Sequence, residues 1–365
     1  MTDFKNRIAV TIFTGFLGSG KTTLLNRVLK DPLLTDTAVI VNEFGEVGID
    51  NLLVEQADDG VIELSNGCLC CTMRGQLVDS LASLVDRLQT GRIKRLNHVI
   101  IETTGLADPA PILQALLGHP AIVQSFVIDG VITTVDAING LETLARHKEA
   151  RNQVAFADRI VLTKTDLVAD KKTLEPLIDE LGKLNPTAEL LYSDAAHCPP
   201  SALVNIGVFD LSNKAPDIRN WLGKEENHEH HHHHHHDVNR HSDTIQAFSL
   251  THDKPIPYFA LEAFIDLLRA NHGAQMLRMK GIVELEEDPS RPVVIHGVQT
   301  LFHPPVRLPE WPKGRHETRL VMITDGIDET TVREMFDAFL GKPVLDKADR
   351  AAMTDNPLAI PGLKF

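Results

Sequence analysis

A glycine-rich motif between an apolar strand and a helix constrains the fold of this chain more than any other feature. The motif begins at Gly15 and reads GFLGSGKT, which matches the pattern GxxxxGK[ST]. The run from Ile8 to Phe13 before it is typical of a buried strand, and the run from Lys21 to about Lys30 after it favours a helix. Such a turn lets backbone N–H groups approach phosphate oxygens at a helix N-terminus, which favours anions. The sequence therefore predicts a nucleotide-binding α/β domain.

Apolar strands alternate with helical segments through the first part of the chain. Because this alternation is typical of βαβ units, it predicts a mainly parallel, doubly wound sheet whose chemistry lies in the loops at the carboxyl ends of the strands. The further strands are expected at 38–41, 61–64, 98–101, 125–136 and 159–162, with a helix at 76–88.

A second unit begins at Thr244. Its strands are expected at 244–250, 276–285, 292–302 and 318–324, with helices at 258–270 and 329–340. Strands paired by hairpins with two helices predict a smaller α+β domain. The expected organisation is a nucleotide-binding domain over 1–223, a His-rich flexible linker over 224–243, the α+β domain over 244–345 and a tail over 346–365.

Four residues are the candidates for phosphate and magnesium chemistry. Lys21 is expected to reach the β- and γ-phosphates, and the Thr22 hydroxyl is expected to bind Mg²⁺. Glu102 ends a predicted strand in the run IIETTG, so its carboxylate can hold Mg²⁺ through water. The amide of Gly105 can approach the γ-phosphate, and this loop is therefore expected to move on hydrolysis.

A base-reading motif follows a later apolar strand. Thr163, Lys164, Thr165 and Asp166 resemble the guanine-reading N-K-x-D tetrad, with threonine in place of the usual asparagine. Asp166 would accept hydrogen bonds from the guanine ring N–H and amino groups, which adenine cannot reproduce, and Lys164 would lie along the base. The motif favours guanine nucleotides over adenine nucleotides.

Three of the four cysteines form the cluster Cys68-Leu69-Cys70-Cys71. This crowding makes a poor disulfide framework, but thiolates are good ligands for Zn²⁺ and other borderline metals. The spacing is too tight for three thiolates to form a tetrahedral set without other ligands. Glu46 is the preferred partner of Cys70 and Cys71 because one carboxylate with two thiolates leaves a position open for transfer. Cys68 is the weakest candidate.

A His-rich run provides a second candidate for metal binding. Imidazoles at this density bind Zn²⁺, Ni²⁺, Co²⁺ and Cu²⁺ loosely, so the run could raise the metal concentration near the thiols. A solvated linker without that role is the alternative. The run consists of His228, His230, His231, His232, His233, His234, His235 and His236.

Composition excludes several other classes. The net charge of −14 argues against a nucleic-acid partner. No apolar stretch approaches the roughly 20 residues needed to span a bilayer, and the N-terminus shows no secretory signal. The clustered thiols suit a reducing compartment, so we expect a cytoplasmic protein.

Together these residues resemble the CobW-like metallochaperone GTPases of the SIMIBI class of P-loop GTPases. The matching segments are GFLGSGKTTLLN, VNEFGEVGID, ELSNGCLCC, IIETTGLADP, TKTD, the His-rich junction and, toward the end, RMKGIV, HGVQTLF and TRLVMI. The resemblance implies slow GTP hydrolysis to GDP, coupled to delivery of a divalent metal ion to a client metalloprotein. It implies base reading by Lys164 and Asp166, Mg²⁺ at Thr22, and cargo metal at Glu46, Cys70 and Cys71. The phosphate contacts it implies lie within 18–23, namely Gly18, Ser19, Gly20, Lys21, Thr22 and Thr23.

Zinc is the expected cargo, and three alternatives stay open. The first is a GTPase of the same kind with a different cargo, either cobalt for cobalamin synthesis or iron or cobalt for a nitrile hydratase. The second is a regulatory GTPase whose cysteines are structural or redox-active. The third, a small-molecule kinase, is disfavoured by Asp166. A homodimer is also left open.

Overall fold

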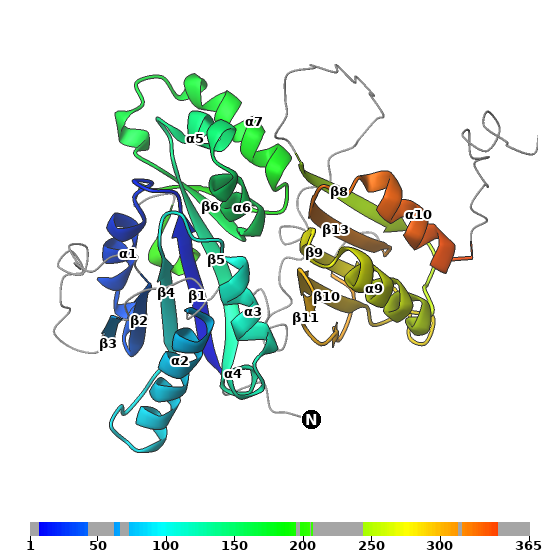
Figure 1. The fold of residues 1–365 in the computed structure, drawn as a ribbon, viewed down its shortest axis with the longest axis horizontal. Helices are drawn as coiled ribbons and strands as arrows, with labels where there is room; N and C mark the ends of the chain where they lie inside the picture. The colour runs from blue at the N-terminus through cyan, green and yellow to red at the C-terminus, as the bar shows by residue number, and fades with distance from the viewer. Residues whose placement is uncertain are drawn as a thin grey trace, which may run out of the picture.

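Two sheets, each with its own helices, make up the computed structural model of the protein (Figure 1). The structure describes residues 7–42, 62–65, 73–194, 198–204, 206, 244–312 and 316–341. The strands of the first sheet lie between Ile8 and Tyr192, and those of the second lie between Ile245 and Asp325.

The first sheet has seven strands in the order β3-β2-β4-β1-β5-β6-β7, and every ladder in it is parallel. Parallel strands place all of their carboxyl ends at one edge, which is where ligands bind in open α/β sheets. The strands are β1 (Ile8–Gly15), β2 (Thr37–Asn42), β3 (Ile62–Ser65), β4 (His98–Thr103), β5 (Phe126–Asp136), β6 (Arg159–Thr163) and β7 (Glu189–Tyr192).

Helices cover both faces of this sheet. Leu24, Leu25 and Val28 of α1 (Lys21–Leu29) pack on one face with the segment 198–204. The opposite face is covered by a longer series of helices: α2 (Met73–Gln89), α3 (Ala110–Gly118), α4 (Pro120–Ser125), α5 (Gly140–Arg146), α6 (Lys148–Phe156) and α7 (Glu175–Leu184).

The second sheet is antiparallel in the order β11-β10-β9-β13-β8, with β12 also paired to β10. Its strands are β8 (Ile245–His252), β9 (Met276–Val283), β10 (Val293–Val298), β11 (Leu301–Phe302), β12 (Val306–Arg307) and β13 (Thr318–Asp325). Its helices are α9 (Tyr258–His272) and α10 (Glu329–Phe339).

The second sheet is buried on both faces. Leu250, Met279 and Met322 pack against α9 and α10 through Phe264 and Phe336. Leu277, Val321 and Ile323 belong instead to the core that contains α3, α6 and α7. Because burial of apolar surface stabilises a contact, this shared core fixes the second domain against the first.

The expected fold class is confirmed. Each of the strands and helices expected from the sequence has a counterpart, with boundaries that differ by a few residues. The run 292–302 forms β10 and β11 rather than one strand, since Gln299 turns the chain with a φ of 52°. The sequence analysis did not specify α3 to α7 or β7. Among the described residues, no helix has the length and apolar character to cross a bilayer.

Candidate nucleotide-binding site

The phosphate loop lies between β1 and α1 and depends on three glycines. Gly18 and Gly20 have φ values of 70° and 86°, which side chains rarely adopt, and Gly20 is the N-cap of α1. At Gly15 a Cβ atom would lie 2.3 Å from Thr134 Oγ1 and 2.5 Å from Thr134 O. The glycines of the motif are therefore required both by backbone conformation and by space.

Side chains from β5 and β6 form hydrogen bonds with the phosphate loop. Ser19 Oγ lies 2.7 Å from Thr134 Oγ1, and Thr163 Oγ1 donates to Ser19 O at 2.7 Å and to Val135 O at 3.2 Å. Lys21 Nζ lies over the loop and donates to Gly15 O at 2.9 Å. The hydroxyl of Thr163, a residue of the predicted base-reading motif, thus contacts the phosphate loop.

The end of β4 meets the phosphate loop directly. Thr22 Oγ1 donates to Glu102 Oε1 at 2.9 Å, although these residues lie 80 positions apart. Glu102 is buried, with 5% of its surface exposed. A hydroxyl and a carboxylate side by side are hard oxygen ligands of the kind that Mg²⁺ prefers, so this pair fits magnesium.

Gly105 also contacts the phosphate loop, at Leu17. A Cβ atom at Gly105 would lie 2.7 Å from Leu17 N and 2.8 Å from Leu17 Cα. The backbone of the Glu102–Gly105 loop therefore rests on the backbone of the phosphate loop, with no room for a side chain. Thr23, the last predicted phosphate contact, is exposed in the first turn of α1.

Lys164 makes an ion pair that the sequence analysis missed. Lys164 has a φ of 57°, and its Nζ donates to Asp136 Oδ2 at 2.6 Å. Asp136 ends β5, and its Oδ1 accepts from the backbone N–H groups of Ile138 and Asn139. Burial alone would raise the pKa of Asp136, but Lys164 and these N–H groups outweigh it and lower that pKa. Asp166, the predicted base reader, follows Lys164 by two residues and is exposed.

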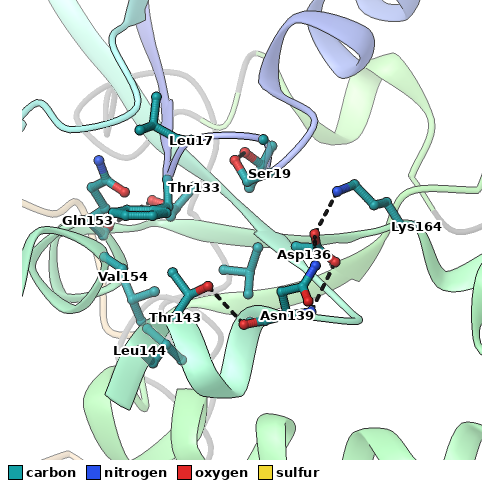
Figure 2. A pocket seen from close by; sticks show the side chains of 16 residues that line it. Leu17, Ser19, Thr133, Asp136, Asn139, Thr143, Leu144, Gln153, Val154 and Lys164 are labelled. Atoms are coloured by element: carbon teal, nitrogen blue, oxygen red, sulfur yellow. Dashed lines mark hydrogen bonds and ion pairs between the residues drawn. The ribbon is translucent and has the colours of Figure 1, made fainter. Parts of the chain in front are cut away.

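A cavity of about 210 Å³ lies between the phosphate loop and helices α5 and α6. Figure 2 shows Leu17, Thr133 and Gln153 at one side of this cavity and the Asp136–Lys164 pair at the other. The signal for Asp136 in the sequence was an aspartate that ends a long apolar strand. Gln153 gave no signal, since nothing in the periodicity of α6 distinguishes a buried amide from a surface one.

The predicted cargo-metal ligands fall outside the described residues. This is so for Glu46, Cys68, Cys70 and Cys71, and for the whole His-rich run. Within the ranges that the structure describes, no group of three or more His, Cys, Asp and Glu side chains could hold a metal ion. Cys198 is described and fully buried, and burial raises the pKa of its thiol.

Two family models match this chain. Residues 9–192 match the CobW/HypB/UreG nucleotide-binding domain, and residues 245–340 match the cobalamin synthesis protein CobW C-terminal domain. The zinc chaperone YjiA of Escherichia coli is 33% identical over 91% of this chain and 98% of its own length. The zinc chaperone CobW of a Sinorhizobium species is 29% identical over 92% of this chain and 98% of its own length.

Solved structures give the same assignment. The Zn(II)-bound YjiA GTPase from E. coli is 29% identical, with a TM-score of 0.67 over 92% of this chain and 99% of that one. A Zn(II)-bound YjiA variant, in which one glutamate and two adjacent cysteines are alanine, has a TM-score of 0.71 at the same identity and coverage. The chain therefore belongs to the CobW family of P-loop GTPases and has both the nucleotide-binding and the C-terminal domain of that family.

Proposed function

We propose that this protein is a slow GTPase that carries zinc as cargo and delivers it to a client metalloprotein, with zinc affinity coupled to the nucleotide state. The observation that carries the proposal is the junction of Thr22, Glu102 and Gly105, where the loop after β4 touches the phosphate loop. A loop held in this way is well suited to respond to a γ-phosphate, because its position depends on contacts at the phosphate loop.

The sheet order supports the coupling. Strands β3, β2 and β4 are parallel neighbours, so their carboxyl ends lie along one edge. β4 ends next to Glu102, whereas β2 ends at Asn42 and β3 at Ser65. Glu46 follows Asn42 by four residues, and Cys70 follows Ser65 by five. The segments that carry the proposed cargo ligands therefore begin at the same edge of the sheet as the proposed switch loop.

The proposed nucleotide contacts follow the motif. Lys21 would contact the β- and γ-phosphates, and the backbone of the loop that includes Gly18 and Gly20 would surround them. Thr22 and Glu102 would hold Mg²⁺. The ion would neutralise the negative charge that develops on the phosphates during hydrolysis. Lys164 and Asp166 would read guanine, and Asp136 would hold the lysine in place through the ion pair at 2.6 Å.

Magnesium binding by Glu102 gives a direct test. Glu102→Gln is expected to shift the Mg²⁺ midpoint of GTP hydrolysis at least about tenfold upward, because a neutral amide is a poorer ligand than a carboxylate. The measurement is a Mg²⁺ titration of steady-state phosphate release. Glu142→Gln, at an exposed ion pair with Arg146, is the control and should leave the midpoint unchanged. An unchanged midpoint in Glu102→Gln would remove Glu102 from the magnesium site.

Zinc is proposed as cargo on two grounds. Similar proteins are named zinc chaperones, among them YjiA and CobW, and a Dictyostelium discoideum protein, 34% identical over 59% of this chain and 52% of its own length, is named a zinc-regulated GTPase metalloprotein activator. The chain also has the adjacent thiols of Cys70 and Cys71 and the candidate carboxylate of Glu46, and ligands of these types suit zinc. Thiolate ligands require a reducing compartment, so we place the reaction in the cytoplasm.

A client could dock beside the nucleotide. Several large apolar side chains are exposed in the loops at the carboxyl edge of the first sheet, and we propose this edge as the docking surface for the client. Leu17 follows β1, Leu106 follows β4 and Leu167 follows β6, with exposures of 60%, 51% and 66%.

The function is tested by zinc titration of the full chain with GDP and with a non-hydrolysable GTP analogue. We expect zinc affinities that differ by at least about fivefold, which corresponds to roughly 1 kcal/mol of coupling. Equal affinities would defeat the coupling. Cys70→Ser with Cys71→Ser should abolish the tight site, whereas Cys198→Ala, at a buried thiol, should retain it. Deletion of 228–236 should remove only the weak zinc binding. Loss of the tight zinc site on that deletion would mean that the histidines, rather than the thiols, bind the cargo.

A further inference from the structure

One buried side chain connects the Glu102–Gly105 loop to a helix. Gln153 of α6 has no exposed surface, and its Nε2 donates to Gly105 O at 3.1 Å and to Ala107 O at 3.0 Å. Its neighbour Asn152 makes a side-chain hydrogen bond to Asp108. α6 therefore contacts three residues of the chain that follows Glu102, namely Gly105, Ala107 and Asp108.

These contacts act on backbone that has little freedom. Gly105 rests on Leu17, and Gln153 holds the Gly105 carbonyl, so both the Cα and the carbonyl of Gly105 are restrained. The backbone of Gln153 is fixed as well, since Thr133 Oγ1 of β5 donates to Gln153 O at 2.8 Å. A displacement of the loop must therefore either break the two amide hydrogen bonds or move α6.

The other end of α6 belongs to the domain interface. Phe156 O accepts a hydrogen bond from Arg278 of β9. Asp158, two residues later, pairs with Arg278 and with Lys280, whose Nζ lies 3.0 Å from Asp158 Oδ1. Gln153 and Phe156 are three residues apart, which is about 5 Å along a helix. The loop contact and the domain contact therefore share one helical turn.

We propose that Gln153 is a positioning residue for GTP hydrolysis, and that the last turn of α6 links the Glu102–Gly105 loop to the C-terminal domain. This inference rests on the proposed function. Gln153 keeps the loop seated on the phosphate loop, and a shift of the loop moves the turn that β9 contacts. Because coupling is reciprocal, a partner bound to the C-terminal domain alters the binding of GTP relative to GDP through the same turn.

The test uses the full chain with Gln153→Met, which keeps the approximate volume and removes both donors. We expect kcat to fall at least about tenfold with KM for GTP changed less than about threefold, since the loop is misplaced while nucleotide contacts remain. We also expect amide exchange across Met276–Val283 to differ between GDP and a non-hydrolysable GTP analogue in the unchanged protein, and this difference to vanish in the variant. A purely structural glutamine would not affect that difference.

The control is Gln114→Met. Gln114 on α3 also contacts the C-terminal domain, through Gln299, but does not lie on α6. It should retain both kcat and the exchange difference. If Gln153→Met does not fold, Asn152→Ala at a half-buried position tests the same loop, with a fall in kcat of about threefold or more.

Two results would overturn the inference. One is a folded Gln153→Met, or in its place a folded Asn152→Ala, with unchanged kcat; the other is an exchange pattern over β9 that does not respond to the nucleotide in the unchanged protein. Failure of the proposed function has a different signature, because the unchanged protein would then bind zinc with equal affinity in the presence of GDP and of the GTP analogue. The exchange comparison requires nucleotide binding alone, so it remains decisive in that case.

Discussion

Gly105→Ala is expected to lower kcat for GTP hydrolysis at least about 100-fold while GDP binding is retained. The new Cβ would lie 2.6 Å from Leu17 Cδ2, 2.7 Å from Leu17 N and 2.8 Å from Leu17 Cα. The leucine side chain can rotate away, but its backbone cannot, because the phosphate loop is held by Thr134 and Thr163. The loop that contains Glu102 must therefore retreat, and a misplacement of about 1 Å can cost about 100-fold in rate.

Steady-state phosphate release and equilibrium GDP binding check this expectation together. GDP lacks the γ-phosphate that Gly105 is proposed to approach, so its affinity should change less than about threefold. Gly182→Ala on α7 is the matched control, since a Cβ there meets no atom within 4 Å. It should leave the rate unchanged and stabilise the fold by about 0.5–1 kcal/mol. A Gly105→Ala protein with unchanged hydrolysis would mean that the loop acts without resting on the phosphate loop.

The sequence predicts those parts of the site that lie within one continuous segment of the chain. The phosphate loop is one continuous motif, and Glu102 is recognisable because it ends an apolar strand. Strand and helix positions follow from periodicity within a few residues, which is why α1, α9 and α10 were expected where they occur.

The parts that could not be predicted depend on the sheet order. Asp136 and Lys164 are 28 residues apart and meet because β5 and β6 are neighbours whose carboxyl ends coincide. Gln153 and Gly105 are 48 residues apart in the sequence, and they meet because α6 packs against β1 and β5. Periodicity shows which face of an element is buried, but it does not specify which side chain lies opposite. Polar contacts between segments far apart in the chain are therefore visible only in the folded structure.

The domain interface carries the second large expected effect: Asp158→Ala should lower the free energy of unfolding by about 3–5 kcal/mol. The side chains of Asp158, Arg278 and Lys280 are 2%, 3% and 3% exposed. Burial, together with Arg278, lowers the pKa of Lys280 to about 8, so Lys280 is still largely charged at pH 7 in the unchanged protein. Removal of the carboxylate would leave the buried Arg278 without its ion-pair partner, and it would lower the pKa of Lys280 further because Asp158 raises that pKa. Urea denaturation followed by circular dichroism measures the loss.

The pH dependence separates this ion pair from a simple packing defect. Burial alone would raise the pKa of Asp158, but Arg278 and Lys280 overcome it and hold that pKa far below its usual range. Because the pKa is lower in the folded than in the unfolded chain, the stabilisation is fully present above about pH 4 and is lost as the pH falls below that value. The stability difference between the unchanged protein and Asp158→Asn should therefore shrink progressively below pH 4. Glu142→Ala, which removes an exposed pair, should cost no more than about 0.5 kcal/mol at pH 7. A pH-independent difference for Asp158→Asn would assign the loss to packing, and the interface would then depend on its apolar core rather than on charge.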